Sequence, residues 1–184
     1  MMKKYKLKDL IFMALCCDLG MFSKGLILPL VNFITALLHL PGGIATSFSL
    51  MFLVIGAAVL PGYGAGTIMG VIQSVLALAL GMTGSMGLLA PISYITPGIV
   101  IDAVLYLTKK RGYGIVISSM AASLTACLVT NLISHKLSGI FLMQYALIAT
   151  CSGAVCGLLA LLVVKGVTPF FKRENSLPQT GENS

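Results

Sequence analysis

The 184-residue chain is 58% hydrophobic and only 9% charged, with a mean hydropathy of +1.01. A soluble domain carries roughly a quarter charged residues, so these few charges cannot cover a surface that faces water. The composition excludes a soluble domain and predicts a chain surrounded by lipid. The net charge of +7 does not predict nucleic-acid binding, because the basic residues are grouped at the chain ends and in one internal turn.

The hydropathy pattern predicts six membrane-spanning helices. The first runs from about residue 7 to residue 28, and the apolar piece at 29–43 is either its continuation or a re-entrant segment on the far side. The other five are expected at 45–60, 64–80, 88–107, 115–133 and 140–164. We therefore expect an all-α integral membrane domain over residues 1–172, a six-helix bundle, followed by a disordered cytoplasmic tail over residues 173–184.

The stretch "PGYGAG" joins the second and third spans. Its glycines allow the positive φ of a tight turn. The spacing of Gly62, Gly64 and Gly66 misses the dinucleotide-binding fingerprint by one residue, and no Walker lysine follows. The stretch therefore predicts a tight helical hairpin and not a phosphate-binding loop.

Basic residues predict the orientation of the spans. Three groups fall on one side of a six-span chain: Lys3, Lys4, Lys6 and Lys8; Lys109, Lys110 and Arg111; and Lys172 and Arg173. We expect this side and both termini to be cytoplasmic, in a multi-pass protein of the plasma membrane.

Three ionisable residues fall inside predicted spans, where each marks a candidate site. Asp18 is expected to pair with a polar group on another helix. Lys24 lies six residues later on a different helix face, where it either extends toward the interface or binds an anionic group of a substrate. Asp102 lies in the inner half of the fourth span.

Polar and aromatic residues of several spans are expected to meet near the outer side. "SYITPG" is expected to break the fourth span at Pro97. A ligand pocket combines apolar walls with a few polar groups, whereas an interfacial belt of Tyr and His is the alternative. The candidate substrate-binding residues are Lys24, Asn32, His39, Ser93, Tyr94, Thr96, Asn131, His135, Gln144 and Tyr145.

Other residues are assigned structural roles. Small residues at 118–126 and 149–157 predict close packing between the fifth and sixth spans. Gln73 is expected to bond between helices. The five cysteines have no metal-ligand spacing with either histidine, and no nucleophile–base pair is evident, so we expect neither a metal, a cofactor nor an enzyme activity.

Four segments together resemble a known family. They are "KDLIFMALCCDLG", the hairpin "LVIGAAVLPGYGAGTIMGVIQ", "ISYITPGIVIDAVLYL" and the turn "KKRGYG". In this order they resemble the S component of an energy-coupling factor (ECF) vitamin transporter, the substrate-binding subunit of an ABC-type importer. The resemblance covers about residues 5–172.

The resemblance implies a function and partners. Such a subunit binds a vitamin or vitamin precursor from outside, associates with a transmembrane T component and two ATPases, and topples in the membrane to deliver its ligand. Cobalamin or a hydroxymethylpyrimidine- or thiamine-related ligand is favoured, and the absence of Trp argues against the tryptophan-rich pocket of thiamine-binding relatives. Docking through small residues on the first helix implies a partner surface here at Ala14, Cys17, Asp18 and Met21, although Asp18 departs from the small-residue pattern.

A different class of function remains open on the sequence. A stand-alone secondary transporter or channel would use Asp18, Lys24 and Asp102 as a coupling relay. Dependence of uptake on ATPase subunits, as opposed to an ion gradient, separates the two functions.

Overall fold

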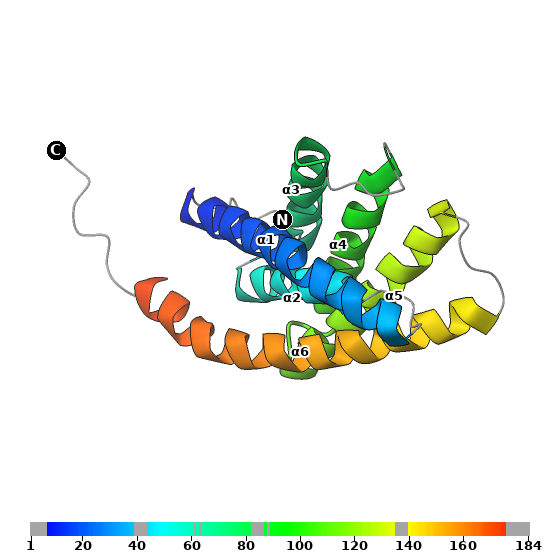
Figure 1. The fold of residues 1–184 in the computed structure, drawn as a ribbon. Coiled ribbons are helices and arrows are strands. Elements are labelled where there is room, and N and C mark those ends of the chain that lie inside the picture. The colour runs from blue at the N-terminus through cyan, green and yellow to red at the C-terminus, as the bar shows by residue number, and fades with distance from the viewer. Residues whose placement is uncertain are drawn as a thin grey trace.

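The computed structural model describes residues 7–38, 44–60, 62, 64–81, 87, 89–134 and 140–175. Within these ranges the chain is all-helical (Figure 1). The helices are α1 (Leu7–Leu38), α2 (Ile44–Val59), α3 (Ala65–Ala79), α4 (Ala90–Leu107), α5 (Gly112–Ser134) and α6 (Ile140–Asn175). The predicted all-α fold and the order of its six helices are confirmed.

Three boundaries differ from the sequence-based expectation. α1 passes through Pro29 and continues to Leu38, so the second apolar piece continues the first helix as far as that residue. The predicted break of the fourth span is wrong, because α4 is continuous with Pro97 inside it. α6 reaches Asn175, so residues 173–175 of the expected tail are helical, and the rest of the tail lies outside the described residues.

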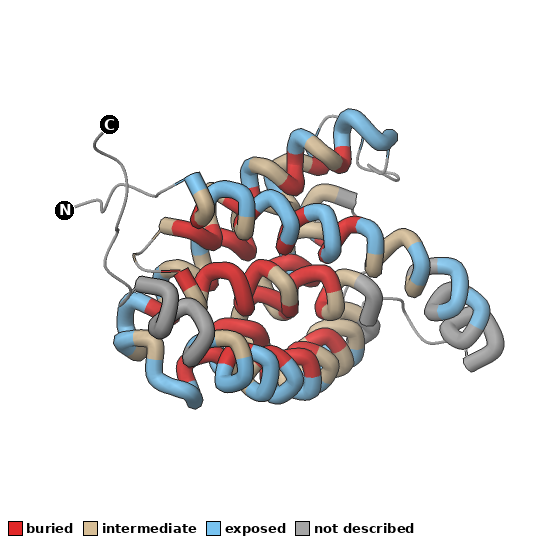
Figure 2. The backbone as a smooth tube through the Cα atoms, turned by 90° about the vertical axis from the view of Figure 1, so that its left-hand side faces the viewer, coloured by how far each residue is buried: buried red, intermediate tan, exposed pale blue. Residues whose placement is uncertain are grey.

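Four described segments are long and apolar enough to cross a membrane: Leu7–Ile27, Ala90–Leu107, Gly112–Ile133 and Leu142–Thr168. The apolar segments of α2 and α3, Thr46–Val59 and Ala65–Ala79, are shorter. Many leucines, valines and isoleucines of the long helices are exposed. Figure 2 marks the exposed stretches of the chain in pale blue. Such a surface is expected for a chain in contact with lipid.

The short helix α2 lies at the centre of the bundle and packs against each of the other five helices. It carries no charged residue and is apolar around most of its circumference, which is typical of a helix buried on all sides. Leu53 and Val54 are fully buried there. α2 therefore supplies the core against which the longer helices pack.

The connection between α2 and α3 is the predicted tight turn. Gly62 and Gly64 have φ angles of 136° and 100°, which a residue with a Cβ rarely adopts. The next glycines serve packing instead. A Cβ at Gly66 would lie 2.9 Å from the carbonyl oxygen of Gly98, and one at Gly70 would lie 2.8 Å from that of Tyr94. α3 and α4 thus approach backbone to backbone.

The predicted close packing of α5 and α6 is also confirmed. A Cβ at Gly153 would lie 2.7 Å from Ser123 Oγ, and one at Gly157 would lie 3.0 Å from Ser119 Cβ. Ser119 Oγ donates a hydrogen bond of 2.8 Å to the carbonyl oxygen of Gly153. Small side chains therefore permit a hydrogen bond between a side chain of one helix and the backbone of the other.

Candidate functional site

Two predicted site residues, 70 positions apart in the sequence, are in direct contact. Lys24 Nζ of α1 donates a hydrogen bond of 2.8 Å to the Tyr94 hydroxyl of α4. The same Nζ lies 4.8 Å from the centroid of the Tyr94 ring. No carboxylate among the described residues forms an ion pair with Lys24, which is half-buried. The structure thus holds a cation inside the bundle with a hydroxyl and a ring as its partners.

Buried polar atoms without partners lie one helical turn before Lys24. A Cβ at Gly20 would lie 2.9 Å from Gln73 Nε2 and 3.4 Å from Ser49 Oγ. Both side chains are buried, and neither of these atoms has a hydrogen-bond partner. The expected interhelical hydrogen bond of Gln73 Nε2 is therefore not formed. A buried polar atom without a partner is costly and is a candidate contact for a ligand or an ordered water.

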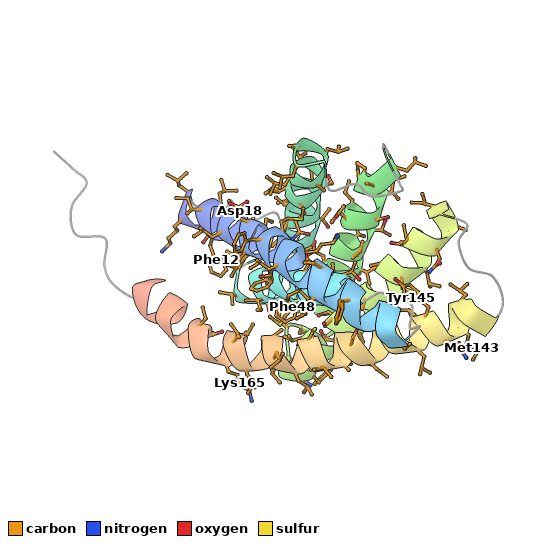
Figure 3. The ribbon with its side chains drawn as sticks, viewed as in Figure 1. Phe12, Asp18, Phe48, Met143, Tyr145 and Lys165 are labelled. Carbon is orange, nitrogen blue, oxygen red and sulfur yellow. The ribbon has the colours of Figure 1, made fainter. Side chains whose placement is uncertain are left out.

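Two further predicted residues, Asn131 and Tyr145, lie on the neighbouring helices α5 and α6. The buried Asn131 donates through Nδ2 to the carbonyl oxygen of Cys127 at 3.1 Å, and its Nδ2 is 3.8 Å from Cys127 Sγ. Tyr145 is half-buried near the start of α6 (Figure 3). Both residues lie near the connection between α5 and α6, at the end of α5 opposite the basic turn at residues 109–111.

The other candidate residues that the structure describes lie in α1, α4 and α6. Ser93 is half-buried, and the Thr96 hydroxyl donates to the carbonyl oxygen of Ile92 in its own helix. Gln144 is exposed. Asn32 lies in α1, but its side chain is outside the described ones, and His39 and His135 lie outside the described residues altogether.

The four residues expected to bind a partner divide between two faces of α1. Ala14 and Asp18 are exposed. Cys17 and Met21 are buried, and Cys17 Sγ donates to the carbonyl oxygen of Met69 at 3.5 Å. Only the exposed pair is free to contact another protein, whereas the buried pair packs inside the bundle.

A cavity of about 430 Å³ lies beside Asp18, between α1 and α3. Its lining residues are Asp18, Met21, Phe22, Gly25, Leu26, Leu76 and Leu80. Asp18 is the one charged residue among them, and the lining is otherwise apolar. Figure 3 shows Asp18 on the first half of α1.

Asp102 and Lys110 form hydrogen bonds to the two ends of the hairpin between α2 and α3, a pairing of roles that the sequence analysis did not predict. The Asp102 carboxylate of α4 accepts hydrogen bonds from the backbone N–H groups of Gly66 and Thr67, at 3.0 and 2.7 Å, and from the Thr67 hydroxyl at 2.7 Å. Lys110 Nζ donates to the carbonyl oxygens of Ala57 and Leu60, at 2.9 and 2.6 Å. An anion thus binds the start of α3 and a cation binds the end of α2, as the helix dipoles favour.

These contacts bear on the alternative relay of Asp18, Lys24 and Asp102. Lys24 is bonded to Tyr94, and Asp102 to the start of α3. Asp18 is exposed on the outside of α1. The three residues make no direct contact with one another in the described part of the chain.

No protein-family model matches the sequence, and the search of curated proteins finds no match either. A solved structure does match the fold. It is a crystal structure of an S component of an ECF transporter, with a TM-score of 0.70 and 20% sequence identity over 94% of this chain and 88% of that chain. The chain therefore has the fold of an S component.

Proposed function

We propose that the chain is the substrate-binding subunit of an ECF-type importer, working with a T component and two ATPase subunits. The observation that carries the proposal is the likeness of its whole fold, over 94% of the chain, to an S component. In this proposal the basic turn at residues 109–111 and the basic chain ends lie in the cytoplasm, and the ligand enters from the opposite side.

Lys24 and Tyr94 are proposed to hold the polar part of the ligand. A lysine inside a membrane bundle is costly unless it has a partner, and here its partner is a neutral phenol. An anionic group of a ligand would supply the missing counter-charge. Ser49 Oγ of α2 and Gln73 Nε2 of α3 have no hydrogen-bond partner and lie close to Gly20, one turn before Lys24 in α1. They support a polar region that extends inward from Lys24 and Tyr94.

The ligand class is proposed to be a vitamin or vitamin precursor, of the cobalamin or hydroxymethylpyrimidine and thiamine-related kinds. Within this range, Lys24 favours a molecule that carries a phosphate or another anionic group. Lys24 disfavours a cationic ligand, because like charges repel strongly in a low-dielectric site. Asn131 and Tyr145 are proposed to contact the ligand from α5 and α6.

The proposal is tested by mass spectrometry of the small molecules that co-purify with the detergent-solubilised chain. The Lys24→Met variant removes the cation at the site, and Lys165→Met removes an exposed lysine of α6 as the matched control. We expect the same vitamin-like molecule with the wild type and with Lys165→Met, and at least about tenfold less of it with Lys24→Met, since a lost charged hydrogen bond costs about 1.5–3 kcal/mol. Recovery of the same amount of the molecule with Lys24→Met would show that Lys24 does not bind it.

A further inference from the structure

Three neighbouring helices leave two buried polar atoms without a partner at one point of the bundle. Ser49 Oγ of α2 and Gln73 Nε2 of α3 both lie within 3.4 Å of the position that a Cβ would occupy at Gly20 of α1. The two residues are 3% and 1% exposed, and neither atom has a hydrogen-bond partner among the described residues. The missing side chain of Gly20 therefore leaves a gap that is bordered by two buried hydrogen-bonding groups.

Packing of the helices does not account for a glutamine at this point. Met69 and Ala77, one turn before and one turn after Gln73 on the same face of α3, are fully buried and apolar. A methionine at position 73 would fill a similar volume there and would carry no N–H group to satisfy. The unpaired amide instead lowers the stability of the empty bundle. Polar groups that lower stability in this way are typical of a binding site, where the ligand supplies the missing hydrogen bond.

The gap adjoins the cation of the proposed site. Lys24 follows Gly20 by four residues, which places it on the same face of α1 about 6 Å further along the helix. The ammonium group of Lys24 and the Nε2 atom of Gln73 are donors only, and the Ser49 hydroxyl is able to donate as well. A ligand that satisfies all three must therefore present acceptor atoms.

The neighbouring cavity limits the charge of the group that enters the gap. Met21 and Leu76, which directly follow Gly20 and lie one turn after Gln73, line the cavity of about 430 Å³ between α1 and α3, so there is space beside the gap. Asp18 lines the same cavity. Its carboxylate disfavours a second anionic group there, because like charges repel strongly in a low-dielectric site.

We propose that Ser49 and Gln73 are specificity-determining residues that donate hydrogen bonds to a neutral acceptor of the ligand, a carbonyl oxygen or an unprotonated ring nitrogen. The inference rests on the proposed function and narrows its ligand class. The ligand then carries two kinds of acceptor, an anionic group at Lys24 and a neutral one about one helical turn away. The three rotatable bonds of the Gln73 side chain let its amide turn from Gly20 toward the ligand while α3 stays in place.

The test compares single variants of the full chain in detergent. Gln73→Met and Ser49→Ala each remove one proposed donor and leave an apolar side chain of similar size. Ser123→Ala is the matched control, because Ser123 Oγ is likewise buried without a partner but lies between α5 and α6, against Gly153. Mass spectrometry gives the amount of the co-purified small molecule per chain. The thermal midpoint is measured after that molecule has been washed out.

The two readouts are expected to move in opposite directions. We expect about fivefold less of the molecule with Gln73→Met and with Ser49→Ala, the effect of one lost neutral hydrogen bond, and no loss with Ser123→Ala. The midpoint of the emptied chain is expected to rise in all three variants, because each removes an unpaired buried atom. A purely structural role, such as an ordered water bound by both side chains, predicts a lower midpoint and an unchanged amount of the molecule.

The outcomes separate this inference from the proposed function. An unchanged amount of the molecule with both Gln73→Met and Ser49→Ala overturns the inference, and depletion by Lys24→Met in the same experiment leaves the proposed function standing. A lower midpoint of the emptied chain in both variants also overturns it, since the two atoms would then stabilise the empty bundle. If Gln73→Met does not fold, the Ser49→Ala result decides. A wild type that co-purifies with no vitamin-like molecule contradicts the proposed function itself.

Discussion

The carboxylate of Asp102 binds the first turn of a helix that begins 37 positions earlier in the chain. It accepts both the backbone N–H and the hydroxyl of Thr67 at 2.7 Å, and the N–H of Gly66 at 3.0 Å. The residue preceding α3 is Gly64, which has no side chain to cap these N–H groups. Asp102 therefore performs from α4 the role that an N-cap residue performs within its own helix.

Replacing Asp102 with Ala is expected to destabilise the chain by about 1–3 kcal/mol, because it leaves the N–H groups of Gly66 and Thr67 without a partner at the start of α3. The loss is measured as a lower thermal midpoint in detergent. Thr67→Val, which removes one of the three hydrogen bonds, is expected to lower the midpoint by less. A midpoint of Asp102→Ala equal to that of the wild type would show that the carboxylate does not stabilise the hairpin.

Lys110 is expected to give the fold a pH dependence of known sign. Burial lowers the pKa of Lys110 below its ordinary value of 10.5, and the nearby Asp102 only partly opposes this. Between the lowered pKa and 10.5 the unfolded chain binds more protons than the folded chain, so the stability that depends on Lys110 rises with pH in that window and is constant below it.

The measurement is the difference in thermal midpoint between the wild type and Lys110→Met, from about pH 8 to about pH 10.5. We expect this difference to move in favour of the wild type as the pH rises. Comparison of the two proteins cancels the contribution of the other lysines to the pH dependence of stability. A difference that falls with pH over the same range would mean that the pKa of Lys110 is raised and not lowered.

Alanine at Gly70 is expected to destabilise the bundle by about 1–3 kcal/mol, the usual cost of overpacking. Its Cβ would lie 2.8 Å from the carbonyl oxygen of Tyr94, so α3 and α4 must separate. Gly166→Ala is the matched control, since nothing lies within 4 Å of a Cβ at that helical glycine. The expected order of thermal midpoints is wild type and Gly166→Ala together, with Gly70→Ala lower. Equal midpoints for the two variants would contradict the close approach of α3 and α4.

The proposed orientation is tested by labelling with a membrane-impermeant thiol reagent in intact cells. Lys109→Cys and Leu89→Cys place a thiol at exposed positions on the two sides, in a Cys151→Ser background because the other four native cysteines are buried. We expect labelling of Leu89→Cys in intact cells and of Lys109→Cys only after the cells are opened. The reverse pattern would place the basic turn outside and invert the scheme.

The order of the six helices can be predicted from the sequence because each is an apolar run separated from the next by Gly, Pro or charged residues. The expected break of the fourth span at Pro97 is wrong for a physical reason. A proline removes one backbone N–H, and neighbouring helices can hold a membrane helix continuous past it, as the close contact of Gly98 with Gly66 does here. The spacing of Gly66 and Gly70 in "GAGTIMG" is a helix-packing signal that lies next to the glycines of the turn and could have predicted the close approach of α3.

The contacts of the candidate site are harder to predict than its members. Lys24 and Tyr94 stand out separately as polar residues in apolar spans, yet their pairing depends on how α1 and α4 cross, which no local pattern encodes. The same holds for Asp102, whose partners lie 35 and 36 positions away. Burial likewise divides Cys17 and Met21 from Ala14 and Asp18, because the first pair faces the core and the second does not.

The central claim is that this chain captures a ligand for an ATP-driven module and does not transport alone. The direct measurement is uptake of the co-purified small molecule into proteoliposomes that contain the chain with or without the T component and the two ATPases. The account predicts uptake that requires the complete module and ATP, and none by the chain alone under a proton or sodium gradient. Gradient-driven uptake by the purified chain would contradict it.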